Sequence, residues 1–536
     1  MGFVEAFLGH VSLKTILATL VGLGFVWHII SRIDEHRRIK RLGGYGRYLK
    51  TYLPLGLDNL FRTIRATIEH RNLEHWRTAL FHPVNSWTSE ARVLNMRVIF
   101  TADPANLKAI LATQFSDYGK GEPFHAEWKD FLGDSIFTTD GPQWHASRQL
   151  IRPQFTRDRV SDLHCFESHV ETLFRAIANG GPLENENQEV DMSRVNGRIL
   201  DISDLFFRYT LDVATEFLLG CDIKSLSTPV QPFAEAFNQV QHIQNIIART
   251  SKARPLYPKF AFWRHLKVVH EFINFYIERA LRMSPDELAR KSKDDHSYTF
   301  LHALAGFTRD RTVLRDQIMS ILIAGRDTTA CTLSWTLYEL ARHPEVVVKL
   351  RAELLDTVGP TRTPTYEDLK NMSYLKAILN EALRLYPAVP FNVRLALKDT
   401  TLPTGGGPDG TQPIAVLKDT PVAYSTLVMQ RRADLYPPVS DNFADPDVFS
   451  PERWAHWHPK PHEYIPFNAG PRICIGQQFA LTEMGYVLCR MFQRYERVTN
   501  YMDEIDGGKP MLKADIVLSP GQGVRVAFWE PKNAGQ

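Results

Sequence analysis

The sequence predicts a mainly α-helical protein with a minor β portion. Three long segments carry apolar residues at three- and four-residue intervals, as amphipathic helices do; they are residues 317–343, 368–385 and 475–496. Strand signals are short and scattered, at residues 92–100, 413–416 and 421–424. No fixed repeat and no Gly/Ser-rich or Pro-rich linker interrupts the chain beyond Lys50. We therefore expect one large domain, although 536 residues would be enough for about three or four.

The composition is that of a folded globular chain without a nucleic-acid partner. Hydrophobic residues make up 44% of the chain, charged residues 23% and aromatic residues 11%, which is enough to bury a large core. The 63 Lys and Arg residues nearly balance the 60 Asp and Glu residues, giving a net charge of +3. Such a balance gives no basic field of the kind by which nucleic-acid binders release counterions.

Five cysteines lie far apart, without a CxxC pair: Cys165, Cys221, Cys331, Cys474 and Cys489. This odd, irregular set predicts neither a disulfide framework nor a structural zinc site. Four of the five are expected to be small buried hydrophobic residues, and Cys474 is the exception. The glycine-rich segment 405–410 lacks the Lys-Ser/Thr of a phosphate-binding loop, so it predicts a turn between short strands.

The N-terminal segment predicts a membrane anchor. Residues 11–30 are largely apolar and would form a helix about 30 Å long, enough to cross a bilayer. Lys14 near one end can reach the interface along its aliphatic stem, and Trp27 near the other end suits the headgroup boundary. A buried core helix is the alternative, but it is less expected at the extreme terminus and before a basic run.

Basic residues set the orientation of this anchor. Residues 1–10 contain no Lys or Arg, whereas six follow the apolar run: Arg32, Arg37, Arg38, Lys40, Arg41 and Arg47. The positive-inside rule then places the body in the cytosol, and a cleavable signal peptide would carry its basic cluster on the other side. We expect a lumenal tail and signal-anchor at residues 1–30, a basic juxtamembrane segment at 31–50 and a cytosolic catalytic domain at 51–536. A single pass would hold the protein on the endoplasmic reticulum membrane.

The segment that carries chemistry is residues 467–476, FNAGPRICIG. Cys474 stands where a loop turns into a helix, so a thiolate there would face the unpaired amides and the positive end of the helix dipole. Gly470 and Gly476 permit tight turns and a close approach of the backbone to a flat ligand. Phe467 can cover the sulfur, and Arg472 offers a charge-assisted hydrogen bond to a carboxylate.

Written as FxxGxRxCxG, this segment resembles the haem-thiolate loop of the cytochrome P-450 monooxygenases at every fixed position. Three further elements follow the family's order: AGRDTT at 324–329 resembles the oxygen-binding groove, EALR at 381–384 the ExxR pair, and PERW at 451–454 the segment whose Arg completes a triad. The resemblance implies the cytochrome P-450 fold with a bound haem b. The iron would take its axial thiolate from Cys474, and the haem would be surrounded by Phe467, Gly470, Arg472 and Gly476.

The resemblance further implies partners and a propionate site. Electrons would come from NADPH-cytochrome P-450 reductase, and O2 and a lipophilic small molecule would be the substrates; whether cytochrome b5 assists stays open. Trp144 and Arg148 match the family's WxxxR contacts with the haem propionates, and their four-residue spacing puts both on one helical face. Without the resemblance they would be an ordinary aromatic residue and a surface Arg.

The ExxR segment also has a physical interpretation. Glu381 and Arg384 are an i, i+3 pair, which alone would be a solvated surface pair worth roughly a few tenths of a kcal/mol. With Arg453 as a third partner, a partly buried network that fixes the core around the haem is the better interpretation.

Asp327 and Thr328 are the candidate catalytic residues. They lie in a helix otherwise lined with apolar residues such as Ile323 and Ala324, where an acid beside a hydroxyl needs partners. Bonding of the Thr328 hydroxyl to the preceding turn would bend the helix, and the acid–alcohol pair could pass protons during oxygen activation. An N-cap for a second helix fits badly, because the apolar pattern continues beyond residue 333.

Within the family, the sequence most resembles the fungal and yeast group that hydroxylates n-alkanes and fatty acids. The likeness is carried by residues 133–138 (GDSIFT), 152–155 (RPQF), 212–217 (DVATEF), 324–330 (AGRDTTA) and 467–484 (FNAGPRICIGQQFALTEM). It implies oxidation of an alkyl chain at or near its terminus. The apolar residues expected to line the substrate pocket are Phe124, Trp128, Phe131, Ile136, Ile323, Ala324, Val389 and Phe391.

Likeness to a group does not settle the substrate, because the shape of a pocket depends on a few side chains. A tailoring oxidation of a fungal secondary metabolite is the second hypothesis. A haem-thiolate isomerase or dehydratase that rearranges a peroxide is more remote, and so is a non-enzymatic haem sensor, since neither needs an acid–alcohol pair.

Overall fold

The computed structural model describes residues 13–156, 163–250, 257–294, 298–440 and 443–531, and it is mainly helical, as predicted. The α-helices of the described residues are α2 (Leu13–Leu42), α3 (Leu57–Ile68), α4 (Asn72–His75), α5 (Pro104–Lys108), α6 (Gly121–Leu132), α7 (Gly141–Ile151), α9 (His164–Asn179), α10 (Ile202–Leu219), α11 (Pro232–Thr250), α12 (Phe260–Arg282), α13 (Pro285–Asp294), α14 (Phe300–Phe307), α15 (Arg311–Leu340), α16 (Pro344–Thr357), α17 (Tyr366–Asn371), α18 (Ser373–Leu385), α19 (Thr426–Met429), α20 (Arg453–His456), α21 (Gln477–Arg494) and α22 (Asp503–Asp506).

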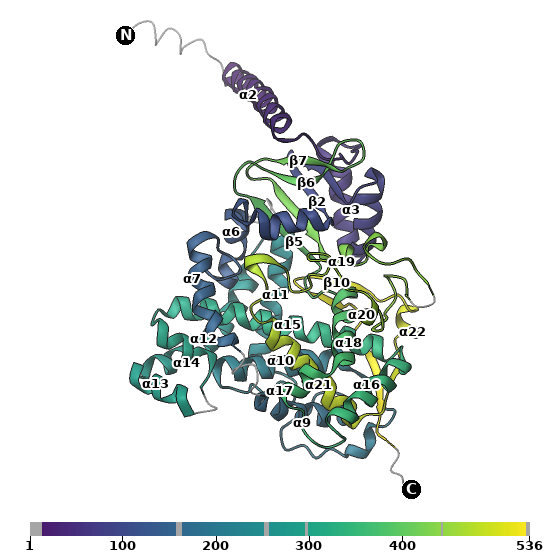
Figure 1. Cartoon of the computed structure of the whole chain (residues 1–536). Helices are drawn as coiled ribbons and strands as arrows, with labels where there is room; N and C mark the ends of the chain where they lie inside the picture. The colour runs from purple at the N-terminus through teal and green to yellow at the C-terminus, as the bar shows by residue number, and fades with distance from the viewer. Residues whose placement is uncertain (1–12, 157–162, 251–256, 295–297, 441–442, 532–536) are drawn as a thin grey trace.

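The minor β portion consists of short strands, namely β1 (Thr88–Val93), β2 (Met96–Thr101), β3 (Tyr118–Gly119), β4 (Leu200–Asp201), β5 (Phe391–Ala396), β6 (Thr400–Gly406), β7 (Gln412–Val416), β8 (Pro421–Ser425), β9 (Arg497–Asn500), β10 (Leu512–Ala514), β11 (Leu518–Pro520) and β12 (Arg525–Trp529). The largest sheet has the order β1-β2-β8-β5-β3 and is antiparallel except between β2 and β8. β6 pairs with β7, β10 with β11, and β12 lies between β4 and β9. The β6–β7 hairpin lies at the end of the molecule from which α2 projects (Figure 1).

Helix α15 is the centre of the helical body. Its first turn is capped by Asp310, whose carboxylate accepts hydrogen bonds from the N–H groups of Thr312 and Val313. It packs against α10, α12, α18 and α21. Residues 316–340 are buried except at three positions, 324, 325 and 328, which are partly accessible. A helix enclosed in this way holds those three positions firmly in place.

Two of the predicted elements are divided in the structure. Residues 92–100 form the end of β1, a turn and most of β2; Leu94 and Asn95 make that turn with positive φ angles of 48° and 68°. The apolar pattern runs across the turn and hides it. Residues 368–385 form α17 and α18, which are separated at Met372, an extended residue that is fully buried. Its side chain continues the helical periodicity although its backbone does not.

The other predicted elements are confirmed. The segments 317–343 and 475–496 correspond to α15 and α21, and the two short strands at 413–416 and 421–424 correspond to β7 and β8. The glycine-rich segment 405–410 is the turn between β6 and β7, where Gly405 and Gly407 have φ angles of 122° and 74°. These angles favour glycine over any other residue.

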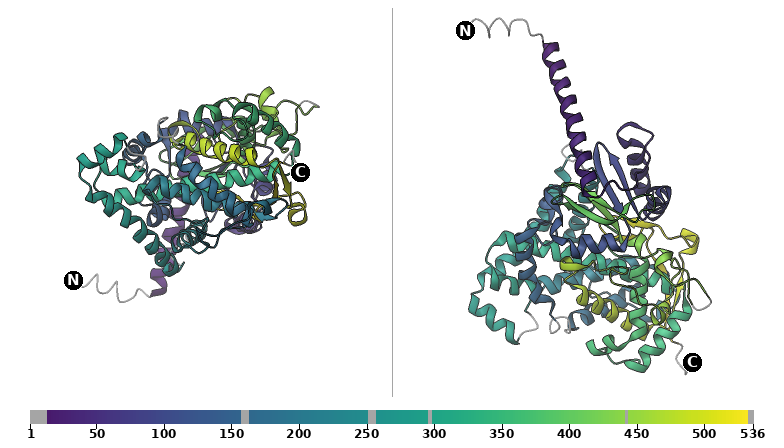
Figure 2. Two further views of the ribbon diagram at one scale, coloured as in Figure 1. Left: turned by 90° about the horizontal axis from the view of Figure 1, so that it is seen from below. Right: turned by 45° about the horizontal axis from the view of Figure 1, so that its top comes forward.

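Helix α2 continues beyond the predicted anchor. Among the described residues, one helix, Ile16–Leu42, is long and apolar enough to cross a membrane. Its most apolar 18-residue stretch has a mean hydropathy of 1.8 and is not buried. Residues 11 and 12 of the predicted span lie outside the described residues. Figures 1 and 2 show the helix projecting from the body.

The second half of α2 is seated on the catalytic body. Ile39 is fully buried and packs against Ala415 and Leu417. The adjacent Arg38 forms an ion pair with Asp399 at 2.6 Å. The first part of the basic juxtamembrane segment is therefore a continuation of the helix that packs on the β6–β7 hairpin. This packing sets the direction in which the apolar part leaves the body.

Candidate active site

The loop before α21 is held in shape by its backbone and by Gly470. The N–H of Cys474 donates to the carbonyl oxygen of Phe467 at 2.9 Å, and the N–H of Ile473 donates to that of Gly470 at 3.0 Å. Gly470 has a φ of +67°, and a Cβ added there would lie 1.8 Å from the carbonyl oxygen of Leu111. Only glycine fits at this position, so the loop can lie directly against the neighbouring backbone.

The Cys474 side chain is exposed, whereas the other four cysteines are buried or partly buried. Protein atoms nevertheless lie close around the thiol, and this desolvation raises its pKa. The N–H of Gly476 and the guanidinium of Arg148 act in the opposite direction and lower the pKa. An accessible thiol beside an N–H donor and a cation can serve as a metal ligand, because a bound metal ion holds it as the thiolate.

Trp144 and Arg148 meet the loop from α7. Trp144 is 6% exposed, and the guanidinium of Arg472 lies 4.7 Å from the centre of its ring. The guanidinium of Arg148 lies 5.9 Å from the same ring, and its Nη1 donates to the carbonyl oxygen of Ile473 at 3.1 Å. The four-residue spacing thus brings both α7 side chains to the cysteine loop, as the sequence predicts.

Arg472 has a carboxylate partner, as expected from its type. Its Nη2 donates to Asp140 Oδ1 at 2.5 Å and to the carbonyl oxygen of Thr139 at 2.8 Å. Its buried Nε has no hydrogen-bond partner among the described residues. Burial, together with nearby Arg394, lowers the pKa of Arg472 to about 10, which leaves it protonated at neutral pH.

Two further basic side chains stand beside Arg472, namely Lys120 and Arg394, and neither belongs to a motif recognised in the sequence. Burial and the charges of Arg394 and Arg472 lower the pKa of Lys120 well below its ordinary value. Asp140 is the acidic group that acts in the opposite direction on both Lys120 and Arg472. The cluster therefore holds more positive charge than one carboxylate balances, and it fits a ligand with anionic groups, such as the two carboxylates of haem.

Within residues 316–340 of α15, the partly accessible positions are Ala324, Gly325 and Thr328. The Thr328 hydroxyl donates to the carbonyl oxygen of Ala324 at 2.6 Å, as predicted for a Thr that bonds to the preceding turn. The three residues occupy neighbouring positions on one side of the helix, because they are separated by one, three and four residues. A Cβ added at Gly325 would meet no atom within 4 Å, so this side has open space beside it, whereas the rest of residues 316–340 is enclosed.

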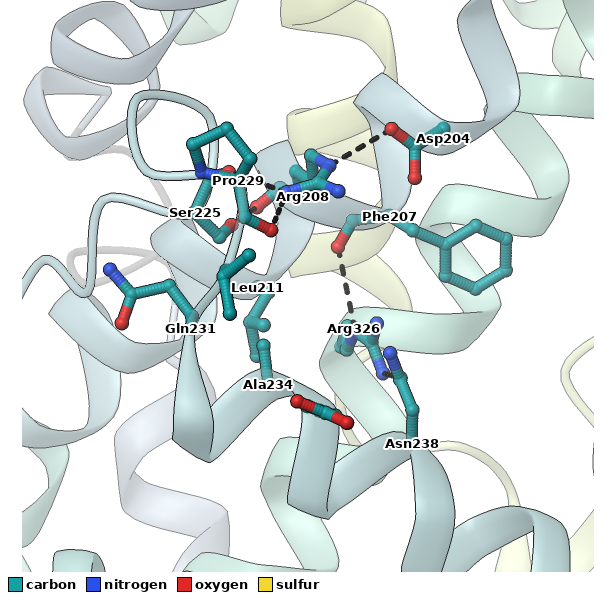
Figure 3. Close-up of a pocket in the computed structure, with 12 residues that line it drawn as sticks. Asp204, Phe207, Arg208, Leu211, Ser225, Pro229, Gln231, Ala234, Asn238 and Arg326 are labelled. Atoms are coloured by element: carbon teal, nitrogen blue, oxygen red, sulfur yellow. Dashed lines mark hydrogen bonds and ion pairs between the residues drawn. The ribbon is translucent and has the colours of Figure 1, made fainter. Parts of the chain in front are cut away.

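Asp327 has partners other than Thr328. Its side chain is 3% exposed, and Oδ1 lies 3.4 Å from Nη1 of the adjacent Arg326. Burial raises the pKa of the Asp327 carboxyl, while Arg326 and a hydrogen bond with the Gln241 side chain lower it. Arg326 is itself held by α11, because its Nη1 donates to Asn238 Oδ1 at 2.7 Å (Figure 3). The acid and the alcohol of the predicted pair are thus adjacent in sequence but have separate sets of contacts.

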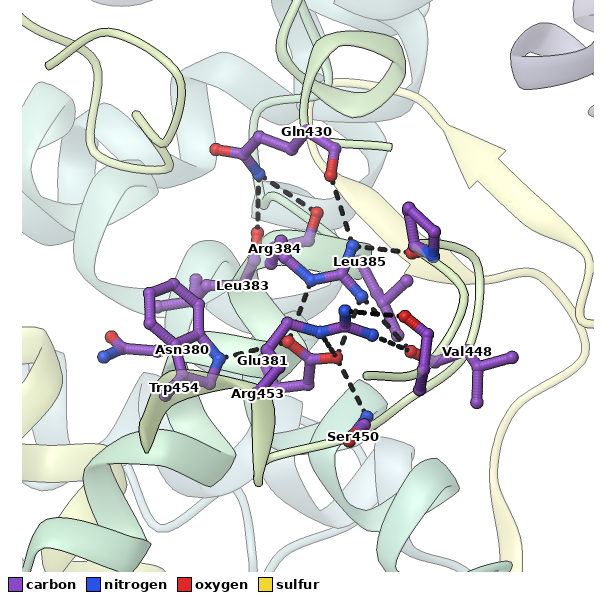
Figure 4. A network of polar contacts seen from close by, with 12 residues as sticks. Asn380, Glu381, Leu383, Arg384, Leu385, Gln430, Val448, Ser450, Arg453 and Trp454 are labelled. Carbon is purple, nitrogen blue, oxygen red and sulfur yellow. Dashed lines mark hydrogen bonds and ion pairs between the residues drawn. The ribbon is translucent and has the colours of Figure 1, made fainter. Parts of the chain in front are cut away.

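Glu381, Arg384 and Arg453 form a fully buried network (Figure 4). Arg384 Nε and Nη2 each donate to a Glu381 oxygen at 2.8 Å, and Arg453 Nε donates to Glu381 Oε1 at 2.9 Å. The Ser450 N–H and the Trp454 Nε1–H complete the hydrogen bonds of the carboxylate. Burial alone would raise the pKa of Glu381, but the two guanidiniums hold it below its ordinary value.

Most of the remaining donors of this network go to backbone carbonyls, and Arg384 Nη1 also reaches the Tyr436 hydroxyl at 3.4 Å. Arg384 Nη1 donates to the carbonyl oxygen of Pro446 at 2.6 Å, and Arg453 Nη2 donates to those of Asp445 and Val448 at 3.0 and 2.9 Å. The network therefore joins α18 to the segment that leads into α20. The side chains of Glu381, Arg384 and Arg453 have no exposed surface. The sequence predicted a partly buried network, and the network is completely buried.

The residues expected to line the substrate pocket have different surroundings. Phe131 and Ile323 are enclosed in one hydrophobic core, with Trp128 and Ile136 packed against it. The rings of Phe124 and Trp128 stack with their centres 5.7 Å apart. These five residues lie on α6, the segment that follows it, and α15.

The other three candidates lie on the accessible side of α15, just before β5 and at the first residue of β5. Ala324 is one of the partly accessible residues of α15. Val389 is 38% exposed, and Phe391 stacks on Trp76 with ring centres 5.0 Å apart.

Comparison with known proteins agrees with the motifs and with this geometry. The family described as "Cytochrome P450" matches residues 88–520. "Cytochrome P450 monooxygenase pvhE" of Talaromyces variabilis is 59% identical over 516 residues, which cover 96% of this chain and 95% of that protein. "Cytochrome P450 52A13" of Debaryomyces hansenii is 41% identical over 464 residues, which cover 83% and 85% of the two chains.

A solved structure shows the same fold. The "cytochrome P450DA heme domain" crystal structure matches with a TM-score of 0.73 at 20% sequence identity, covering 92% of this chain and 99% of that one. The match includes nearly the whole of the compared domain, so the similarity concerns the architecture and not one part of it. This chain is therefore a member of the cytochrome P450 family, an oxidoreductase that uses haem with an axial cysteine thiolate to carry out monooxygenation.

Proposed function

We propose that this protein hydroxylates a lipophilic alkyl chain, an n-alkane or a fatty acid, at or next to its terminus. The observation that carries the proposal is the likeness of its motifs to the fungal and yeast hydroxylases of such chains. The 41% identity to the Debaryomyces hansenii protein of the 52A series supports it. An apolar channel that admits a chain end-on presents only its last carbons to the reacting centre.

We assign the haem contacts to residues of this chain. Cys474 would supply the thiolate that binds the haem iron, and Phe467, Gly470 and Gly476 shape the loop that carries it. Arg148, Arg472 and Trp144 would hold the haem carboxylates, and we add Lys120 and Arg394 to them. The residues fit the group: the thiol is accessible, Arg472 Nε is buried and has no partner in the described part of the chain, and Gly470 lets the loop lie close to the next backbone segment. When bound, the haem supplies the activation of dioxygen with electrons from the reductase.

The accessible side of α15 supplies the protons. The Thr328 hydroxyl keeps its position by donating its hydrogen to the Ala324 carbonyl, so its oxygen is free to accept a hydrogen bond, and it relays a proton when the bond to Ala324 opens. Asp327 on the same turn is the acid that replenishes this hydroxyl. Glu381, Arg384 and Arg453 act at a distance, because they fix the polypeptide around the haem without contacting it.

Replacement of Thr328 by Ala is expected to preserve haem and substrate binding but to waste reducing equivalents. The hydroxyl that positions the proton is lost, so more NADPH is consumed for each product molecule. The measurement is product formed per NADPH consumed. Thr332→Ala is the matched control, because Thr332 makes the same type of bond, at 2.8 Å to the Thr328 carbonyl, one turn further along. Equal ratios in Thr328→Ala and wild type would show that Thr328 is only structural.

We propose that α2 anchors the protein in the endoplasmic reticulum membrane by a single pass, with residues 51–536 in the cytosol. The basic residues that follow the apolar run support this orientation. There the catalytic domain meets NADPH-cytochrome P-450 reductase, with cytochrome b5 as a candidate second electron donor. A lipophilic substrate enters from the bilayer.

Removal of residues 1–30 is expected to release much of the protein from membranes and to leave its haem content unchanged. Within the described part of the deleted segment, residues 16–30 are exposed, and the second half of α2 stays packed on the β6–β7 hairpin. Some association is expected to persist through exposed apolar residues of α3 such as Phe61 and Ile68. The measurement is membrane fractionation together with haem content. A truncated chain that folds without binding haem would contradict the anchor assignment. As a control, a full-length chain in which leucines replace residues 16–30 should stay in the membrane fraction.

A second candidate function is a tailoring oxidation of a fungal secondary metabolite. The identity to the Talaromyces variabilis monooxygenase, 59%, is higher than to the 52A protein, and this observation favours it. A screen of substrate-binding spectra against alkanes, fatty acids and aromatic or terpenoid metabolites distinguishes the two. Binding and turnover of the alkyl substrates would support the alkyl proposal, and turnover of a ring-bearing metabolite alone would replace it. Peroxide rearrangement without reductase would instead identify an isomerase.

A further inference from the structure

A buried histidine on α9 lies among carboxylates of α10 and of the segment that follows α10. His169 is 3% exposed, and the charges of Asp222, Asp212 and Glu216 all act on its imidazole. Lys224 acts electrostatically on Asp222, but its ion pair is with a different carboxylate. Three carboxylates around one imidazole leave an excess of negative charge even when the ring is protonated, so this place favours a cation.

One ring nitrogen of His169 is left without a partner. Nε2 lies 2.5 Å from Oε2 of Glu216, whereas Nδ1 makes no hydrogen bond with the described residues. The ring of Tyr209 packs edge-on against the imidazole, with the ring centres 6.4 Å apart. A polar atom of a buried side chain normally has a partner. In metal sites, a histidine commonly donates one ring N–H to a carboxylate and binds the metal ion through its other nitrogen.

Two of the carboxylates offer oxygen ligands beside this ring. The possible ligand atoms of His169, Asp212 and Asp222 all lie within 4.8 Å of one another. Asp212 is 1% exposed and is held by the N–H groups of Ser225 and Leu226, which donate to its two oxygens at 2.7 and 3.0 Å. A carboxylate has further lone pairs for a metal ion. Asp222 is accessible, so an ion can enter from solvent.

Cys165 belongs to an alternative group. Its Sγ, a ring nitrogen of His169 and an oxygen of Glu216 also lie within 4.8 Å of one another. Two ligands of one tetrahedral zinc ion lie about 3.3 Å apart, because each bond is about 2.0–2.1 Å long. The 2.5 Å contact between Nε2 and Glu216 is too short to hold an ion between them. Glu216 therefore fits better as the carboxylate that orients the ring.

We propose that His169 Nδ1, Asp212 and Asp222 bind one zinc ion, with water as the fourth ligand, and that Glu216 is the positioning residue that holds the imidazole. Zn²⁺ binds histidine nitrogen and carboxylate oxygen, whereas Ca²⁺ and Mg²⁺ take oxygen ligands. The ion neutralises two carboxylates and joins α9 to α10, the helix that packs against α15. The cysteine pattern did not predict this site, because none of its ligands is a cysteine.

The first test is equilibrium dialysis of the haem-loaded full-length protein against Zn²⁺ after treatment with a chelator. Mass spectrometry of the metals counts zinc against haem iron, and one zinc per iron is expected. His169→Gln removes Nδ1 and keeps an amide that can donate to Glu216, and Asp222→Asn removes a charged ligand at an accessible position. Each is expected to weaken binding by more than about 100-fold, because loss of an outer-shell partner alone costs about 10–100-fold.

Two variants serve as matched controls and should bind zinc as the wild type does. His164→Gln changes an exposed histidine of the same helix that belongs to neither group of ligand atoms. Glu186→Gln removes an exposed carboxylate close by, the partner of Lys224.

X-ray absorption at the zinc edge identifies the ligands, since haem iron absorbs at a different energy. Nitrogen and oxygen at about 2.0–2.2 Å are expected, without sulfur at about 2.3 Å. Glu216→Gln should weaken binding about 10–100-fold and keep the same ligands. Zn²⁺ should also raise the unfolding temperature of the wild type but not that of His169→Gln, because only the first binds the ion when folded.

Absence of one bound zinc per iron in the wild type would overturn the proposal. Wild-type affinity in both His169→Gln and Asp222→Asn would overturn it too, because the ion would then lie elsewhere. A sulfur ligand would overturn the choice of Asp212 and Asp222. An unchanged affinity in Glu216→Gln would overturn the positioning role of Glu216. None of these results depends on which substrate the enzyme oxidises.

Discussion

Replacement of Cys474 by Ser is expected to abolish monooxygenase activity. A neutral hydroxyl cannot supply the electron-donating thiolate that favours cleavage of the O–O bond. The substitution changes one atom at an exposed side chain, and the backbone bond from Cys474 to Phe467 does not depend on that atom. The loss should therefore be chemical and not a loss of fold.

Product formation and the carbon monoxide difference spectrum measure this effect together. The variant should lack the red-shifted band of a thiolate-ligated haem. Cys165→Ser is the matched control, because Cys165 is a partly buried cysteine whose Sγ contacts the carbonyl oxygen of Val213 and not the loop of Cys474. Retention of the thiolate band in Cys474→Ser would show that another residue is the ligand.

Replacement of Glu381 by Gln is expected to be the most destabilising single change in the ionic network. It leaves the guanidiniums of Arg384 and Arg453 in a fully buried place without their counter-charge. Removal of one partner of a buried ion pair costs about 3–5 kcal/mol. The measurement is the urea concentration at which haem is released and helicity is lost.

A surface pair with the same spacing gives the control for this prediction. Arg71 and Glu74 are also separated by three residues, at 2.6 Å, but their side chains are 56% and 54% exposed. Glu74→Gln should change stability by less than about 1 kcal/mol. Similar effects of the two substitutions would contradict the structural role assigned to burial at Glu381.

The haem loop could be predicted because its chemistry is contiguous in sequence. Residues 467–476 carry the cysteine, the glycines and the arginine within ten consecutive positions. The tight contact of Gly470 with the neighbouring backbone explains why glycine stands there. The ExxR pair became interpretable for the same reason. The complete burial of this pair could not be predicted, because it depends on the segment around Arg453, which lies far along the chain.

The contacts that escaped prediction depend on how distant segments meet. Lys120 stands between two glycines near α6, and Arg394 lies in β5, so no local pattern places either beside Arg472. Asp327 was predicted to pair with Thr328, and its bond with Gln241 depends on where α11 packs on α15. Ile39 lies among basic residues, and only the β6–β7 hairpin explains its burial.

The hairpin at residues 92–100 was hidden by composition. Val93, Leu94 and Met96 continue an apolar run through the turn, and Asn95 is the one residue there that commonly adopts a left-handed conformation. A single Asn is too weak a signal to divide such a run. The prediction of one strand was therefore wrong although the β character was correct.

The most direct test of the proposed function is product analysis with isotopically heavy dioxygen. The full-length protein, reconstituted with reductase and NADPH, is supplied with dodecane or dodecanoic acid, and the products are identified by mass. The expected product carries a single heavy oxygen atom on the terminal carbon or the one next to it. Absence of any labelled alkyl product, together with efficient labelling of a ring-bearing metabolite, would contradict the assignment of an alkyl-chain substrate.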